Sequence, residues 1–363
     1  MDVEAQIKEL KARKQREREA LHYPLVPPNA DGTLVRICDG IYWARLPIPM
    51  GLDHINVYLL EDDDGWYLLD TGLNTAKNQQ LWQSITENHC ATKPVKGVIC
   101  THFHYDHSGL ATWLSQYFEV PLYMTHGEFY MLESMSNGVS HLGNQQQRLF
   151  YQKAGVPDDK MDAMFDACRN DPFMEHRPRQ FTRLRGGEGF KIGKRNWHIL
   201  IGEGHSPEHA CFYSEANVDE PAILIVGDQL LPEISANILI TDREPNANPL
   251  KLLLNSQDAF NALDANTLVL PAHGPIYKNM HIRIDQFKQH HNRHLAVLTE
   301  LASEQAFTPW KAMLTLFTRP LSPMDQVLAL GETLAHLNYL IFDGQLQKQY
   351  QANECVDLYK TNT

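Results

Sequence analysis

The sequence has no closely spaced cysteines. Its six cysteines lie at positions 38, 90, 100, 168, 211 and 355, and no two of them form a C-x-x-C pair. A metal site built on thiolates is therefore not expected, because such sites use cysteines at short spacing. A disulfide framework is also not expected in a chain of 363 residues without a secretion signal. We predict six reduced thiols.

The sequence also lacks a long hydrophobic run. No stretch approaches the roughly 20 apolar residues that a membrane-spanning helix needs. Residues 1–22 are charged throughout and contain no apolar core of the kind found in signal peptides. Acidic and basic residues interleave there at helical spacing, which predicts an exposed helical arm over residues 1–25. These features predict a cytoplasmic protein with no membrane partner.

Positive charge is in the minority. The chain has 32 Lys and Arg against 44 Asp and Glu, a net charge of -12. This balance argues against broad binding to a polyanion, since phosphate contacts dominate such affinity. We therefore expect no DNA partner, whereas a small anionic ligand held by a few Arg or Lys side chains is compatible with the charge.

Residues 34–275 contain many short apolar runs typical of strands, separated by turn-forming residues and helical stretches. Two sheets packed face to face with helices outside would bury these runs, which predicts an α+β fold in one domain over residues 26–280. Residues 127–171 are expected to form a helical insertion in it. The expected strands are 41–43, 54–60, 66–70, 95–100, 120–124, 181–184, 197–201, 209–213, 222–226 and 267–270.

Residues 281–363 have a different pattern. A long helix is expected over 282–305, a helix start at Thr308 and Pro309, and a further helix over 323–341. With a hairpin beyond Gly344, this order predicts a small winged-helix-like α domain. Its last helix contains no Lys or Arg, although a groove-reading helix normally carries them. We expect a packing or dimerisation element, with a homodimer as one outcome.

The most informative stretch is H-F-H-Y-D-H at residues 102–107. Four of its six side chains can bind a metal, and it directly follows the apolar run 95–100. The ligands therefore lie on a loop at the end of a buried strand, which predicts a metal site with a low risk of coincidence.

Three later candidates also follow apolar runs. His205 lies in G-H-S-P-E-H, Asp228 in V-G-D and His273 in P-A-H-G. Each is weak alone, but ligands at strand ends converge on one rim of a sandwich. The remaining histidines, including His290 and its neighbours 291 and 294, indicate an exposed helix face.

The order H-x-H-x-D-H, G-H-S-x-x-H, G-D and A-H-G resembles the metallo-β-lactamase fold superfamily over residues 34 to about 280, and Asp70-Thr71-Gly72 matches its earliest motif. The resemblance implies a four-layer αββα sandwich. The appended domain is similar to the lactamase-β-like group, which is close to the glyoxalase II hydrolases.

This resemblance implies a role for each site residue. One zinc ion would take His102, His104 and His205. A second would take Asp106, His107 and His273, with Asp228 bridging both; iron and manganese are alternative metals. Asp70 would orient a ligand imidazole. His209 would lie near the substrate or simply be a satisfied histidine at a strand start.

Two metal ions about 3.5–4 Å apart would hold a bridging hydroxide at neutral pH. That hydroxide would attack a carbonyl or phosphoryl centre, with Asp106 as proton acceptor. The group's bacterial members make a small thioester, ester or lactone the expected substrate, and a single-strand endoribonuclease in the same group makes RNA cleavage the alternative. A one-iron persulfide dioxygenase is a third hypothesis.

One basic cluster stands out in the acidic chain. It predicts either a charged strand edge or an anchor for an anionic tail, such as that of a coenzyme A or glutathione thioester. Its arginines are Arg177, Arg179, Arg183 and Arg185.

Overall fold

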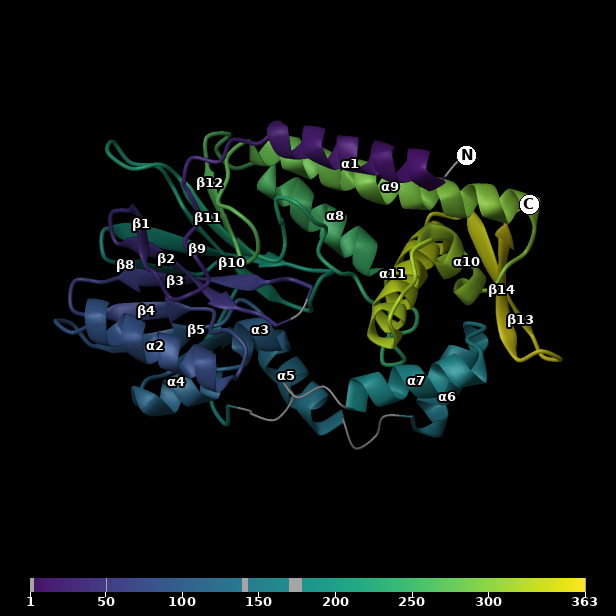
Figure 1. The fold of residues 1–363 in the computed structure, drawn as a ribbon, viewed down its shortest axis with the longest axis horizontal. Helices are drawn as coiled ribbons and strands as arrows, with labels where there is room; N and C mark the ends of the chain where they lie inside the picture. Colours follow the sequence, from purple (N-terminus) through teal and green to yellow (C-terminus); the bar gives the residue numbers. More distant parts are fainter. Residues whose placement is uncertain (1–2, 50, 139–142, 170–177, 363) are drawn as a thin grey trace. The chain divides into compact units, whose positions relative to one another are not determined.

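The computed structural model describes residues 3–49, 51–138, 143–169 and 178–362. The chain forms two compact units, each assembled from several stretches (Figure 1). Unit 1 comprises Met1–Ser136, Phe173–Ala236 and Ser256–Gln286, and unit 2 comprises Asn137–Pro172, Asn237–Asn255 and Phe287–Thr363. The segments of the two units therefore alternate along the sequence. Two consecutive domains, residues 26–280 and 281–363, were expected instead.

Unit 1 contains two sheets. The first has the strand order β1-β2-β3-β4-β5-β6-β7, and the second β12-β11-β10-β9-β8. Most pairs are antiparallel, but β4, β5, β6 and β7 run parallel, as do β11 and β12. The strands are β1 Val35–Cys38, β2 Ile41–Pro47, β3 His54–Glu61, β4 Trp66–Leu69, β5 Val95–Ile99, β6 Leu122–Thr125, β7 Thr182–Leu184, β8 Gly189–Ile192, β9 Arg195–Gly202, β10 His209–Ser214, β11 Ile223–Gly227 and β12 Leu268–Pro271.

Apolar residues pack on both faces of each sheet. Between the sheets, Trp43 and Tyr58 of the first share a core with Trp197 and Phe212 of the second. The outer face of the first sheet packs against α2 (Ala76–His89) and α4 (Ala111–Tyr117). The outer face of the second packs against the end of α8 (Pro249–Phe260) and the start of α9 (Met280–Glu304). The predicted four-layer αββα sandwich is confirmed.

Unit 2 is mainly helical. Helices α6 (Gln145–Lys153), α7 (Asp158–Arg169), α10 (Pro309–Leu316) and α11 (Pro323–Phe342) pack with the rest of α9 around a shared apolar core. The chain ends in the antiparallel hairpin of β13 (Leu346–Gln351) and β14 (Val356–Thr361).

The predicted helix start at Thr308 is confirmed, since its hydroxyl accepts a hydrogen bond from the Lys311 amide and caps the helix. The winged-helix comparison stays a prediction.

Helix α8 was not expected from the sequence. Its apolar residues Leu250, Leu253 and Phe260 are all buried, so burial in the folded chain stabilises a segment whose local pattern is too short to stand out. The expected helical insertion appears as α5 (His126–Gly138), α6 and α7, within the part of 127–171 that the structure describes.

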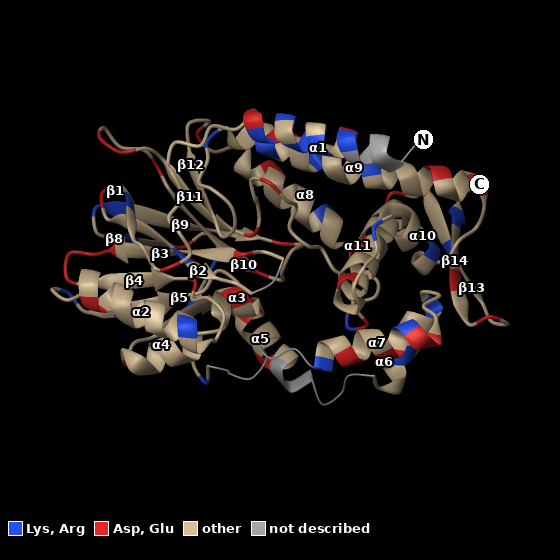
Figure 2. Cartoon of the chain, viewed as in Figure 1, with Lys and Arg blue, Asp and Glu red and all other residues tan. Residues whose placement is uncertain are grey.

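The N-terminal arm forms helix α1 (Val3–Glu19), which carries charges of both signs (Figure 2). Across the described residues, no helix has a stretch both long and apolar enough to span a bilayer.

All six cysteines are free thiols, as predicted, and only Cys355 is exposed. Burial raises the pKa of Cys38 to about 11 and that of Cys90 to about 12. Because the thiolate is the reactive form, these buried thiols react slowly near neutral pH.

We therefore expect Cys355 to react first when the folded protein is treated with a maleimide at pH 7.5. Mass spectrometry of the time course would show one fast modification, which the Cys355→Ser variant loses and the Cys90→Ser variant keeps. A fast phase that persists in Cys355→Ser would contradict this assignment.

Candidate metal centre

The seven candidate ligands come from five places in the chain that meet at one rim of the sandwich. Two lie in the loop after β5, two in the short helix α3 (Tyr105–Ser108), and the others follow β9, β11 and β12. Each follows the C-terminal end of a strand, either directly or through a short loop. The described structure thus brings together His102, His104, Asp106, His107, His205, Asp228 and His273, whose potential ligand atoms form two groups within 4.8 Å.

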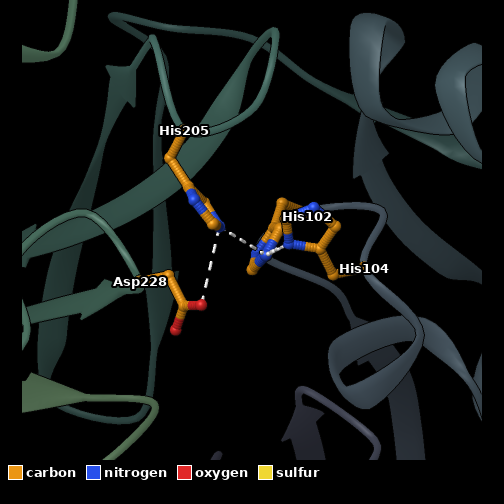
Figure 3. A group of neighbouring side chains, drawn as sticks. All are labelled: His102, His104, His205 and Asp228. Atoms are coloured by element: carbon orange, nitrogen blue, oxygen red, sulfur yellow. Dashed lines mark hydrogen bonds and ion pairs between the residues drawn. The ribbon is translucent and has the colours of Figure 1, made fainter. Parts of the chain in front are cut away.

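The first group combines three imidazoles with the carboxylate of Asp228 (Figure 3). His102 Nε2 lies 2.8 Å from His104 Nδ1 and 3.2 Å from His205 Nε2. Ligand atoms about 2.0–2.1 Å from a tetrahedral zinc ion lie about 3.3 Å from one another. The three nitrogens are therefore spaced as ligands of one cation.

The second group combines two imidazoles with a carboxylate. Asp106 Oδ2 lies 3.2 Å from His273 Nε2 and 3.5 Å from His107 Nε2. This arrangement suits a second cation, because imidazole nitrogens and carboxylate oxygens are both zinc ligands.

Asp228 lies between the groups and presents a different oxygen to each. Its Oδ2 is 3.5 Å from His205 Nε2, whereas its Oδ1 is 3.5 Å from both His107 Nε2 and His273 Nε2. A carboxylate placed in this way can bridge two cations.

Hydrogen bonds behind the imidazoles determine which nitrogen faces the centre. Asp70 Oδ2 accepts from His107 Nδ1 at 2.9 Å, and the His54 carbonyl accepts from His273 Nδ1 at 2.8 Å. In both rings Nε2 is left to face the centre. Asp70 itself is held by the amide and hydroxyl of Thr101, so the orienting role expected for it has a structural basis.

His209 is fully buried behind the centre. Its ring stacks on His102 at a centroid distance of 4.6 Å, and its Nε2 accepts from the Asp228 amide at 3.2 Å. Gly227 permits this approach, because a Cβ there would overlap the His209 ring and the φ of +52° disfavours other residues. Two roles were expected for His209, contact with the substrate or a structural role with its hydrogen bonds satisfied. The structural role matches this position.

Two imidazoles of the first group, those of His102 and His104, are kept neutral. Burial, together with the neighbouring imidazoles, lowers the pKa of His102 well below its usual value and that of His104 to about 3. Neutral imidazole is the form that binds a metal, so these rings offer lone pairs over the physiological pH range.

The second group is rich in negative charge. Burial alone would lower the pKa of His107 and His273, but Asp106 and Asp228 outweigh it and raise both. The imidazoles in turn outweigh burial at Asp106 and lower its pKa to about 2. The carboxylates thus stay ionised and attract positive charge to this position.

Three buried atoms that face the centre make no hydrogen bond within the described chain: His107 Nε2, His273 Nε2 and Asp228 Oδ1. Buried polar atoms normally have partners, so each such atom needs an explanation. Metal ions would satisfy all three, and the donor set of imidazoles and carboxylates without thiolates is typical of hydrolytic zinc sites. The residues therefore fit a pair of metal ions.

Glu128 was missed by the sequence analysis. This fully buried carboxylate on α5 accepts from the Phe103 amide at 2.9 Å, and from the Ser206 hydroxyl and the Glu208 amide at 2.7 Å each. It thereby ties the H-x-H loop to the His205 loop. In the sequence, Glu128 could have been identified by its position just after the apolar run of strand β6, because the candidate metal ligands also follow apolar runs.

The arginine cluster lies on exposed chain. Arg183 and Arg185 sit on and just after the edge strand β7, and their guanidinium groups lie 3.9 Å from Glu208 and 3.5 Å from Glu188. Arg179 is also exposed, and Arg177 falls outside the described residues. These positions match the interpretation of the arginines as charges on a strand edge. Their role as an anchor for an anionic substrate stays a prediction.

Comparison with known proteins agrees with this geometry. The family model of the metallo-beta-lactamase superfamily matches residues 50–273, and the model of a metallo-beta-lactamase-like C-terminal domain matches residues 295–361. A Bacillus subtilis (strain 168) protein named "Probable metallo-hydrolase YqjP" is 25% identical over 318 residues, covering 85% of this chain and 94% of that protein.

Two solved structures are similar over most of their length. A beta-lactamase domain protein from Burkholderia ambifaria is 33% identical with a TM-score of 0.85, covering 95% of this chain and 99% of that one. A metallo-beta-lactamase family protein from Thermus thermophilus is 28% identical with a TM-score of 0.73, covering 90% and 100%. With a family model matched over more than half of its length, the chain belongs to the metallo-beta-lactamase superfamily.

Proposed function

We propose that the protein is a binuclear zinc-dependent hydrolase that cleaves a small thioester, ester or lactone. The observation that carries this proposal is the position of Asp228, whose two oxygens face two separate groups of ligand atoms. The name of the B. subtilis relative, a probable metallo-hydrolase, supports the same class of reaction.

His102, His104 and His205 would hold one ion, Asp106, His107 and His273 the other, and Asp228 both. When bound, such a pair lowers the pKa of water to about 7 and polarises the attacked carbonyl or phosphoryl oxygen. Imidazoles and carboxylates without thiolates are the donors that hydrolytic zinc sites use.

The protein's own residues determine where the reaction takes place. His102 and His107 are fully buried, whereas the Asp106 carboxylate keeps 15% of its surface exposed. The centre is therefore closed from behind and open on the side of Asp106. At that open side the Asp106 carboxylate, which the neighbouring imidazoles keep ionised, would accept a proton during the reaction.

A small substrate suits the charge of the molecule better than RNA. The net charge is -12, and α11 carries Asp325 and Glu332 but no Lys or Arg. An extended phosphodiester would need a basic face. The exposed Arg179, Arg183 and Arg185 offer only a local anchor, which fits an anionic tail such as that of coenzyme A or glutathione.

We expect the Asp228→Asn variant to lose metal and activity together, because one bridging oxygen and its charge are removed. Metal affinity should fall by about 100-fold or more, since losing even a partner behind the ligands typically costs 10–100-fold. Elemental analysis after dialysis against zinc would measure the stoichiometry. The control is Asp219→Asn, in an exposed loop, which should bind like the wild type.

Substrate class is tested with zinc-loaded protein on a panel of acyl-CoA thioesters, glutathione thioesters, esters and lactones, with single-stranded RNA alongside. We expect turnover of a carbonyl substrate that Asp106→Ala abolishes. RNA cleavage that disappears in the same variant, without turnover of the panel, would favour the endoribonuclease. One iron per chain in place of zinc would favour the dioxygenase.

The Glu128→Gln variant tests the support between the ligand loops. The glutamine side chain has one acceptor oxygen where glutamate has two. The substitution therefore leaves at least one of the three buried donors without a partner, which costs about 1–3 kcal/mol. We expect a lower free energy of unfolding and weaker zinc binding, measured by denaturant titration and competition with a chelator. Glu133→Gln on the same helix is the control, and equal behaviour of the two variants would refute the role of Glu128.

A further inference from the structure

A second group of metal-binding side chains lies in unit 2, outside the centre described above. It was expected to be an exposed helix face, but His291 and His336 are fully buried. The group joins two helices that pack together, α9 and α11. Its members are His290, His291 and His294 on α9, and Glu332 and His336 on α11.

The helical spacing places these side chains on facing surfaces. His290 and His294 are four residues apart on α9, as are Glu332 and His336 on α11, so each pair occupies one face of its helix. Metal sites in helical bundles are built in this way, from side chains that project inward from facing helices.

The ligand atoms lie close enough to share an ion. Those of His294, Glu332 and His336 are all within 4.8 Å of one another, and so are those of His290, His291 and Glu332. Glu332 belongs to both sets. His291 Nδ1 lies 3.0 Å from His336 Nε2, which is close to the 2.8 Å between His102 Nε2 and His104 Nδ1 in the other centre.

The tautomer of His336 is determined by its own helix. Its Nδ1 lies 2.8 Å from the Glu332 carbonyl oxygen, which can only accept a hydrogen bond. In the neutral ring Nε2 is then the nitrogen that carries the lone pair. The same arrangement orients the ligand imidazole of His273 through the His54 carbonyl.

Glu332 is a buried carboxylate surrounded by imidazoles. Only 13% of its side chain is exposed, and its carboxylate lies 3.7 Å from Nδ1 of His294. A buried charge is normally paired or bound to a metal, because leaving it uncompensated is costly.

We propose that unit 2 contains a separate binding site for a divalent transition-metal ion, held by His294, Glu332 and His336. Zinc fits this donor set of imidazoles and a carboxylate. His291 Nδ1 lies beside this set, 3.0 Å from His336 Nε2. The ion links α9 to α11, so its role is to stabilise unit 2 rather than to take part in catalysis.

The site is tested in the full-length chain by zinc binding. After removal of metal with a chelator, the protein is dialysed against zinc and its metal content measured. We expect wild-type protein to hold one ion more per chain than Glu332→Gln or His294→Gln, with affinity at this site falling by about tenfold or more in each variant. His281→Gln, at the start of the same helix, should retain the ion.

The Asp228→Asn variant separates this proposal from the proposed function. It lowers binding at the first centre, whereas the ion between α9 and α11 should remain and should still be lost on adding Glu332→Gln. Equal metal content with and without Glu332→Gln in this background would overturn the proposal.

A second measurement needs no variant and so does not depend on how the variants fold. Crystals of the zinc-loaded wild type, measured at the zinc absorption edge, should give an anomalous peak between Glu332 and His336. No peak at that position would also overturn the site.

Discussion

Compensation of buried charge governs the architecture of the first centre. Asp70 and Asp228 are buried together with His102, His107 and His273, and Asp106 keeps only 15% of its surface exposed. Taking such groups out of water costs several kcal/mol for each ion unless opposite charges compensate. The imidazoles and carboxylates shift each other's pKa in opposite directions. The rest of unit 1 can be understood as the scaffold that holds these groups together.

That scaffold places the ligands at the ends of strands. Parallel neighbours such as β4 and β5, or β11 and β12, end at the same edge of their sheets, so the residues that follow them converge. The core between the sheets, around Trp43 and Trp197, holds the two edges in register. Because the ligand atoms have separations near 3 Å, small shifts between the sheets would separate them. Packing and metal binding therefore depend on the same residues.

Side chains and backbone groups behind the ligands determine how the ligands are oriented. Thr101, Asp70 and the His54 carbonyl fix ring orientation, and Glu128 joins two loops. None of these except Asp70 belongs to a recognisable motif. A carboxylate that accepts backbone amides from loops separated by tens of residues leaves no periodic trace in the sequence.

The amino-acid sequence alone was sufficient to predict which side chains gather at the centre, most strands and the sandwich. Metal ligands are few in kind, and buried strands are apolar runs, so both are visible locally. Tertiary structure decided the rest. Three features depend on which distant surfaces meet: the alternation of the two units' segments along the sequence, the helix Pro249–Phe260, and the burial of His291 and His336. A histidine on a helix looks the same in sequence whether it faces water or another helix, because only packing determines its neighbours.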